Sequence, residues 1–113
     1  MIQEVEISLG AKRKISPETI IMLKSDANYT NVYLIDGSHF LSSITLGKLA
    51  KRLEGFEFFR PNRSVLVNEK FIQKFSPSIY IDAGPFIQLL NHTLIPISRR
   101  KVKNLTFAQK YNI

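Results

Sequence analysis

Apolar residues in this chain recur in short runs with a period of two, and polar turn residues separate the runs every eight to twelve positions. Val5, Ile7 and Leu9 alternate with polar residues, and Asp36-Gly37 is a strong signal for a tight hairpin. Many short strands with regular turns are typical of a mainly β fold with antiparallel sheets. Strands are expected over 5–9, 12–15, 19–23, 32–35, 39–43, 71–75, 79–81, 86–90 and 94–97.

Two segments follow a helical period instead. In the segment from about 45 to 54, Leu46, Leu49 and Leu53 form one apolar stripe, Thr45 can cap the start and Gly55 can end the helix. Its basic residues are most simply a solvated face. A short C-terminal helix is expected over about 98–109, with Ser98 as its N-cap.

Length and composition indicate one domain, residues 1–113. The 113 residues are 44% hydrophobic, which suits one modest core. The chain has no cysteine, so disulfides and thiolate metal sites are excluded. No apolar run approaches the length of a membrane span, and the acidic N-terminus does not resemble a secretory signal. We therefore expect a cytoplasmic protein without a membrane partner.

Signals for catalysis are weak. The two histidines, His39 and His92, lie in or beside expected turns, and neither has a second ligand type at helical spacing. The chain contains no P-loop, glycine-rich dinucleotide loop or nucleophile elbow. The sequence predicts neither an enzyme nor a metal or cofactor site.

Positive charge is the strongest compositional signal for a partner. The net charge is +7, and no acidic residue follows Asp82. A basic chain favours DNA, RNA or an anionic membrane surface, although a basic tail can also serve only solubility. Arg99, Arg100 and Lys101 follow the Ser98 cap, where cations cost about 0.3–1 kcal/mol each because the helix N-terminus is itself positive. This placement favours an anion site, and DNA phosphates are common anions.

Two further polar segments interrupt apolar material. In FFRPNRSVLVN, Pro61 predicts a rigid bend that projects Asn62, Arg63 and Ser64. Arginine can bind guanine edges with two hydrogen bonds and asparagine can do so for adenine, but a solvated loop is equally consistent with this segment alone. The other segment, 25–31, carries Tyr29, which could pack on its own hairpin or enter a DNA groove.

The motifs of these segments resemble the LytTR family of bacterial DNA-binding domains. The pattern F-x-R-x-x-R-S-x-x-V-N covers residues 58–68, and P-x-S-R-R covers residues 96–100. With Ile20 to Leu23 and Ala27-Asn28-Tyr29, the resemblance extends from about residue 4 to residue 107.

The resemblance implies an elongated domain of small antiparallel sheets that binds double-stranded DNA. Loops at one edge would enter successive major grooves, and two copies would occupy direct repeats and bend the DNA in transcription regulation. It implies base contacts from Tyr29, Asn62, Arg63 and Arg99, and phosphate contacts from Asn28, Thr30, Ser64, Arg100 and Lys101. The positive charge of the same C-terminal stretch adds Lys103 as a phosphate candidate.

Many members of that family carry a receiver domain or membrane helices before this domain. The sequence is compatible with a stand-alone regulator and with part of a longer protein that has a sensor or receiver domain. Two other functions remain open: a β-rich protein-interaction or ligand-sensing module with an incidental basic face, and an RNA-binding β protein. RNA platforms need exposed aromatics, whereas most phenylalanines here lie in strand patterns that indicate a core.

Overall fold

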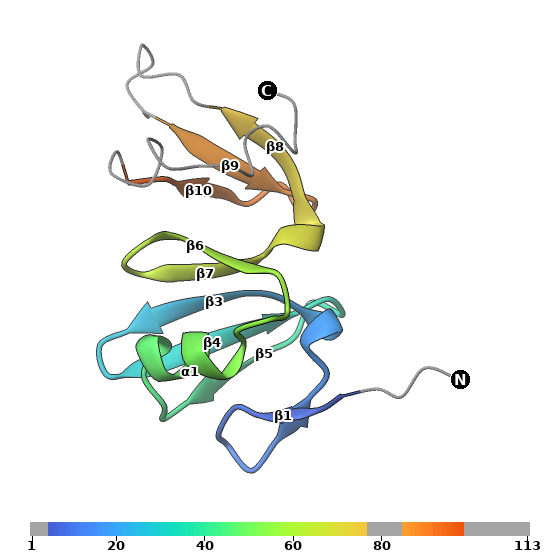
Figure 1. Cartoon of the computed structure of the whole chain (residues 1–113), viewed down its shortest axis with the longest axis vertical. Helices are drawn as coiled ribbons and strands as arrows, with labels where there is room; N and C mark the ends of the chain where they lie inside the picture. Colours follow the sequence, from blue (N-terminus) through green and yellow to red (C-terminus); the bar gives the residue numbers. More distant parts are fainter. Residues whose placement is uncertain (1–4, 77–84, 99–113) are drawn as a thin grey trace.

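The computed structural model describes residues 5–76 and 85–98, which form three antiparallel sheets and one α-helix (Figure 1). The mainly β fold predicted from the sequence is therefore confirmed. The elements in chain order are β1 Ile7–Ser8, β2 Lys14–Ile15, the 3-10 helix η1 Pro17–Thr19, β3 Ile20–Asp26, β4 Tyr29–Leu34, β5 His39–Ser42, α1 Leu46–Arg52, β6 Phe58–Asn62, β7 Val65–Asn68, the 3-10 helix η2 Glu69–Phe71, β8 Ile72–Ser76, β9 Phe86–Leu89 and β10 Leu94–Pro96.

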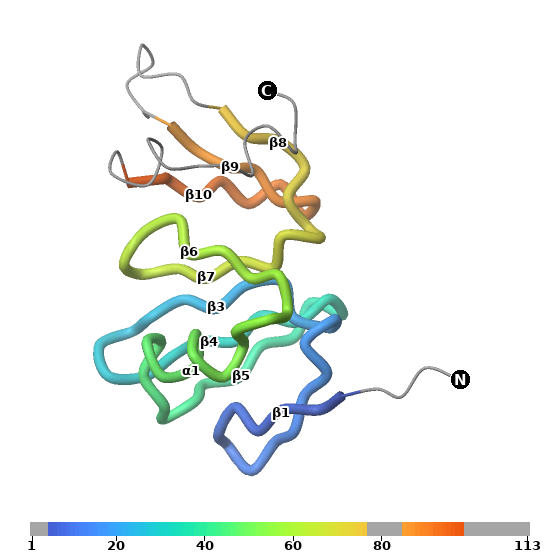
Figure 2. Tube along the Cα trace, in the orientation of Figure 1, coloured from blue at the N-terminus to red at the C-terminus, as the bar shows by residue number. Residues whose placement is uncertain are grey.

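The largest sheet has five strands in the order β5-β4-β3-β7-β6. Its centre is β3, which pairs with β4 from Ile20 to Asp26 and with β7 from Met22 to Lys24. Strands β8, β9 and β10 form a second sheet, and β1 and β2 form a small hairpin. Figure 2 shows the three-stranded sheet and the five-stranded sheet following one another along the long axis of the molecule.

Two apolar clusters hold these sheets together. One lies between the five-stranded sheet, α1 and the first hairpin, and its fully buried members include Leu9, Leu23 and Leu49. The other joins the opposite face of the five-stranded sheet to the three-stranded sheet around Val67 and Phe75. Alternation along β7 divides the strand between the clusters, because Leu66 belongs to the first while Val65 and Val67 belong to the second.

The α1 helix confirms the predicted apolar stripe. Leu46, Leu49 and Leu53 are buried, and Gly55 ends the segment with a positive φ of 89°. Thr45 occupies the N-cap position without a side-chain capping hydrogen bond. On the solvent side, Arg52 Nη1 donates a hydrogen bond of 2.8 Å to the Ser8 carbonyl and ties α1 to the first hairpin.

The predicted turn at Asp36-Gly37 is present but longer than a two-residue turn. Tyr33 pairs with His39, and the Leu34 N–H donates to the Ser38 carbonyl, so Ile35 lies in the turn and is exposed. The Ser38 hydroxyl and backbone N–H both donate to Asp36 and lower the pKa of its carboxyl below the ordinary value.

Several other strand boundaries differ from the sequence predictions. Val5 lies outside β1 and is exposed, because the first hairpin pairs only Ile7–Ser8 with Lys14–Ile15. Strand β3 runs three residues past the predicted end at Leu23, because its ladder with β4 continues to Asp26. The predicted strand 79–81 and helix 98–109 fall outside the described residues, apart from Ser98.

Candidate nucleic-acid interface

The β6–β7 turn consists of Arg63 and Ser64, and side chains on β6 fix its shape. Asn62 Oδ1 accepts a hydrogen bond of 2.8 Å from the Ser64 N–H, which forms an Asx turn. Arg60 Nη2 donates a hydrogen bond of 2.8 Å to the Arg63 carbonyl. The turn backbone is thereby held from both ends, while the Arg63 side chain stays exposed.

Proline 61 lies within β6 rather than in the turn. It is buried, and its missing N–H is tolerated because β6 is an edge strand whose register shifts between Phe59 and Asn62. Its carbonyl accepts a hydrogen bond of 2.9 Å from the Ser98 N–H. Pro61 therefore connects β6 to the residues that follow β10.

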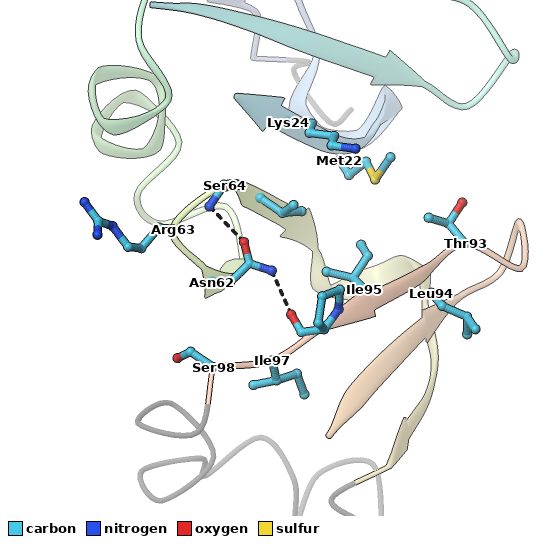
Figure 3. A pocket seen from close by; sticks show the side chains of 12 residues that line it. Met22, Lys24, Asn62, Arg63, Ser64, Thr93, Leu94, Ile95, Ile97 and Ser98 are labelled. Atoms are coloured by element: carbon cyan, nitrogen blue, oxygen red, sulfur yellow. Dashed lines mark hydrogen bonds between the residues drawn. The ribbon is translucent and has the colours of Figure 1, made fainter. Parts of the chain in front are cut away.

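The side chain of Asn62 makes a second connection to the same place. Its Nδ2 donates a hydrogen bond of 2.7 Å to the Pro96 carbonyl in β10, as Figure 3 shows. Both polar atoms of Asn62 are therefore engaged within the protein. These two bonds let Asn62 position the turn, and the base contact expected of Asn62 stays a prediction.

The β3–β4 turn adjoins the β6–β7 turn. The Ser25 N–H donates a hydrogen bond of 2.8 Å to the Ser64 carbonyl, and Lys24 pairs with Val65. Only Ala27 and Asn28 separate β3 from β4, and Ala27 has a φ of 55°, which L-residues seldom adopt. Asn28 and Tyr29 are exposed at the tip of this hairpin, with half of the Tyr29 side chain accessible.

Thr30 points the other way. It is completely buried, and its Oγ1 donates a hydrogen bond of 2.7 Å to the Ile44 carbonyl. The phosphate contact expected of Thr30 does not fit this placement. Alternation along β4 explains the difference, since Tyr29 and Thr30 face opposite sides of the sheet.

The two turns and the end of β10 with Ser98 lie on one edge of the molecule, on the left in Figure 1; we call this the turn edge. Hydrogen bonds connect its three parts in series, from Ser25 to Ser64 and from Asn62 and Pro61 to Pro96 and Ser98. Among the described residues, the turn edge exposes the cations Lys24 and Arg63 and the acid Asp26. The predicted contacts Arg99, Arg100, Lys101 and Lys103 lie outside the described residues.

A groove of about 580 Å³ runs beneath the β6–β7 turn, between β10 and β3. Most of its walls are apolar, and Figure 3 shows that the Arg63 side chain points away from Asn62 and from the rest of the lining. Lys24, which the sequence patterns did not single out, also lines it. The lining residues are Met22, Lys24, Asn62, Arg63, Ser64, Val65, Thr93, Leu94, Ile95, Pro96, Ile97 and Ser98.

Within residues 5–76 and 85–98, no three metal-ligating side chains converge, and no helix is long and apolar enough to cross a membrane. His39 stacks on Tyr33 with ring centroids 5.3 Å apart, and His92 lies 3.4 Å from the Gln88 amide nitrogen. Both histidines thus contact their own hairpins.

Residues 11–109 match the family model described as the LytTr DNA-binding domain. The chain belongs to the LytTR family of DNA-binding domains. It is 30% identical over 105 residues to the sensory transduction protein LytT of Oceanobacillus iheyensis, a match that covers 92% of this chain and 43% of that protein. The chain thus spans less than half the length of this curated relative.

The fold also matches a solved LytTR structure. The LytTr DNA-binding domain of a Bacillus cereus protein, described as a methyl-accepting/DNA response regulator, superposes with a TM-score of 0.74 at 16% identity. The match covers 98% of this chain and all of the Bacillus cereus chain. The LytTR resemblance inferred from residues 58–68 and 96–100 is therefore confirmed, and the turn edge belongs to a domain of a DNA-binding family.

Replacing Asn62 with alanine should weaken binding to all duplexes by a similar factor, because the turn loses its hydrogen bonds to Ser64 and Pro96. The free energy of unfolding should fall by about 1–2 kcal/mol. Affinities for a preferred duplex and for its single-base variants measure the effect. A loss confined to one base position would instead identify Asn62 as a base contact.

Proposed function

We propose that this LytTR domain binds a specific duplex DNA sequence through the turn edge, as the output domain of a bacterial transcription regulator. The observation that carries the proposal is the series of hydrogen bonds joining the β3–β4 turn, the β6–β7 turn and the end of β10. Because these hydrogen bonds already fix the turns relative to one another, binding to a rigid duplex would not have to order them first, and less free energy would be lost on binding.

We propose that the turns enter successive major grooves on one face of the duplex, without a recognition helix. The β3–β4 and β6–β7 turns are short and expose Tyr29 and Arg63, and the turn edge follows the longest axis of the molecule in Figure 1.

We assign base contacts to Tyr29, Arg63 and Arg99. The first two have exposed side chains at the tips of adjoining turns, and Arg99 follows Ser98 directly. Asn28, Ser64, Arg100, Lys101 and Lys103 would contact phosphates, because such contacts hold the domain in register without specifying sequence. We propose that Asn62 and Thr30 position these groups from within the fold.

We further propose that two copies bind adjacent direct repeats and bend the DNA. The relative LytT carries the words sensory transduction in its name, and the chain covers 43% of it. A receiver domain on a longer chain, or on a separate protein, would then control when the turn edge meets DNA.

Selection of bound duplexes from a random pool tests this function. Enrichment of one short repeated motif is expected, and failure to enrich any motif would contradict sequence-specific binding. With roughly five phosphate contacts, log affinity for the selected duplex should fall with log salt concentration at a slope of about −4 to −5. A slope near zero would contradict the electrostatic part of the proposal.

The groove beneath the β6–β7 turn favours a second candidate, a ligand-sensing module. Its volume of about 580 Å³ and mostly apolar walls suit a small apolar molecule. If the selection enriches nothing, this function becomes the better explanation. Thermal stabilisation by members of a small-molecule library would then be the measurement to make.

A further inference from the structure

A second groove, of about 590 Å³, lies between α1 and β6 on the other side of the sheet from the first. Lys48 and Lys51 line it from α1 and Arg60 lines it from β6, while Phe58 and Leu66 supply apolar wall. Glu54 is the one carboxylate among the described lining residues. The groove is therefore electropositive, and we call it the α1–β6 groove.

The two lysines have no role in the described fold. They are three residues apart on α1, so they share one side of the helix, and both are exposed. Neither forms an ion pair with a carboxylate in residues 5–76 or 85–98. Arg52 differs, because its guanidinium binds the Ser8 carbonyl and serves the fold.

Arg60 brings a fixed charge to the same groove. The side chain is half-buried and its Nη2 is held by the Arg63 carbonyl, so the guanidinium is already ordered next to the turn. Its Nε is buried and has no hydrogen-bond partner among the described residues. A guanidinium ordered in this way retains donors for an oxygen ligand at little further loss of freedom.

The groove continues the turn edge. In Figure 1 the α1 helix begins on the same side of the molecule as the β3–β4 and β6–β7 turns. The Arg60–Arg63 hydrogen bond joins the groove to the exposed arginine of the β6–β7 turn. An anion in the groove would therefore lie beside whatever that turn contacts.

We propose that the α1–β6 groove binds a phosphodiester of the DNA backbone that flanks the bases contacted by the β6–β7 turn. Lys48 and Lys51 approach the phosphate from one side and Arg60 from the other. Lys48 and Lys51 extend the DNA footprint past the family motifs in residues 58–68 and 96–100, whereas Arg60 belongs to the first motif. The assignment rests on the proposed function. The two cations on α1 thus have a binding role beyond a solvated helix face.

Glutamine substitutions of Lys48 and Lys51, singly and together, test the assignment. The double variant should reduce the steepness of the salt slope on the selected duplex by about one unit, which is the share of one phosphate, and each single variant should reduce it by less. Lys70→Gln is the control, because it removes the same charge from η2 on the opposite edge in Figure 1. Lys70 lies 3.6 Å from the Glu18 carboxylate, but both side chains are exposed and such a pair contributes little to stability. All three lysines are exposed, so the free energy of unfolding should stay near the wild-type value.

Neutralising single phosphates of the duplex with methylphosphonate locates the contact. Wild-type protein should lose affinity at one phosphate flanking the selected motif, and the Lys48→Gln/Lys51→Gln protein should lose none there. The groove assignment is overturned if the Lys48→Gln/Lys51→Gln protein has the same salt slope and the same methylphosphonate profile as Lys70→Gln. The proposed function stands in that case, provided that the wild-type affinity still falls steeply with salt concentration. If the wild-type protein prefers no duplex and its salt slope is near zero, the proposed function itself is contradicted, and the groove assignment fails with it.

Discussion

Replacing Arg63 with alanine should lower the affinity for the preferred duplex by about 1–3 kcal/mol, which corresponds to roughly 5- to 150-fold. The side chain is exposed in a turn whose backbone is fixed by Arg60 and Asn62. A guanidinium presented this way can donate two hydrogen bonds to a guanine edge. The preference for a base at one position should relax in the same variant.

Two further variants distinguish a base contact by Arg63 from a general effect of its charge. Arg63→Lys keeps the charge but loses the two-pronged geometry, so it should retain nonspecific affinity and lose the base preference. Arg13→Ala removes an equal charge from the first hairpin, where the guanidinium lies 4.4 Å from the Phe40 ring, and should leave the base preference unchanged. If Arg63→Ala weakens preferred and random duplexes equally, Arg63 contacts only phosphate.

Periodic burial is the part of this fold that the sequence predicts well. Leu46, Leu49 and Leu53 recur at helical spacing because α1 buries one side, and the alternation around Leu23 and Val32 reflects a sheet with one face on the first cluster. An element that is buried on one side has a periodic apolar pattern, which can be recognised in the sequence without knowing which elements pack against it. The helix and most strand positions were therefore predictable.

Strand segments that are stabilised mainly by backbone hydrogen bonds to a neighbouring strand show no apolar periodicity in the sequence. The end of β3 is polar, and its residues Ser25 and Asp26 fall in the segment 25–31 that was expected to be a turn, although they pair with Thr30 and Tyr29 of β4. Strand β6 includes Pro61, which normally interrupts strands and is accommodated here on a sheet edge. These extensions carry Asn28, Tyr29 and Arg63 to the turn edge, so the site depends on the least predictable parts of the fold.

The candidate site was predictable in its exposed groups but not in its internal supports. Arg63 and Tyr29 are exposed at turns, as their polar surroundings indicated. Thr30 and Asn62 were expected to face DNA, yet they bind carbonyls 14 and 34 residues away along the chain. Hydrogen bonds across such separations depend on how the sheets pack, which residue type and local spacing do not specify.

Replacing Asn68 with alanine should lower the free energy of unfolding by about 2–3 kcal/mol. The side chain is 1% exposed at the end of β7. Its Oδ1 caps η2 by accepting a 3.0 Å hydrogen bond from the Lys70 N–H, and its Nδ2 donates to the carbonyls of Ile20 and Pro17 at 3.0 and 3.4 Å. Alanine would remove the side-chain amide and leave the Lys70 N–H and the carbonyls of Ile20 and Pro17 without this hydrogen-bond partner in a buried site.

Asn91→Ala is the control that separates burial from turn formation. Asn91 Oδ1 accepts a 3.1 Å hydrogen bond from the Thr93 N–H in an exposed turn, where water can replace the lost group. Its replacement should change the free energy of unfolding by about 0.5 kcal/mol or less. Chemical denaturation of both variants measures the difference. Equal losses would mean that the donations to Ile20 and Pro17 contribute nothing beyond the η2 cap, and the link from β7 to the start of β3 would then rest on apolar packing alone.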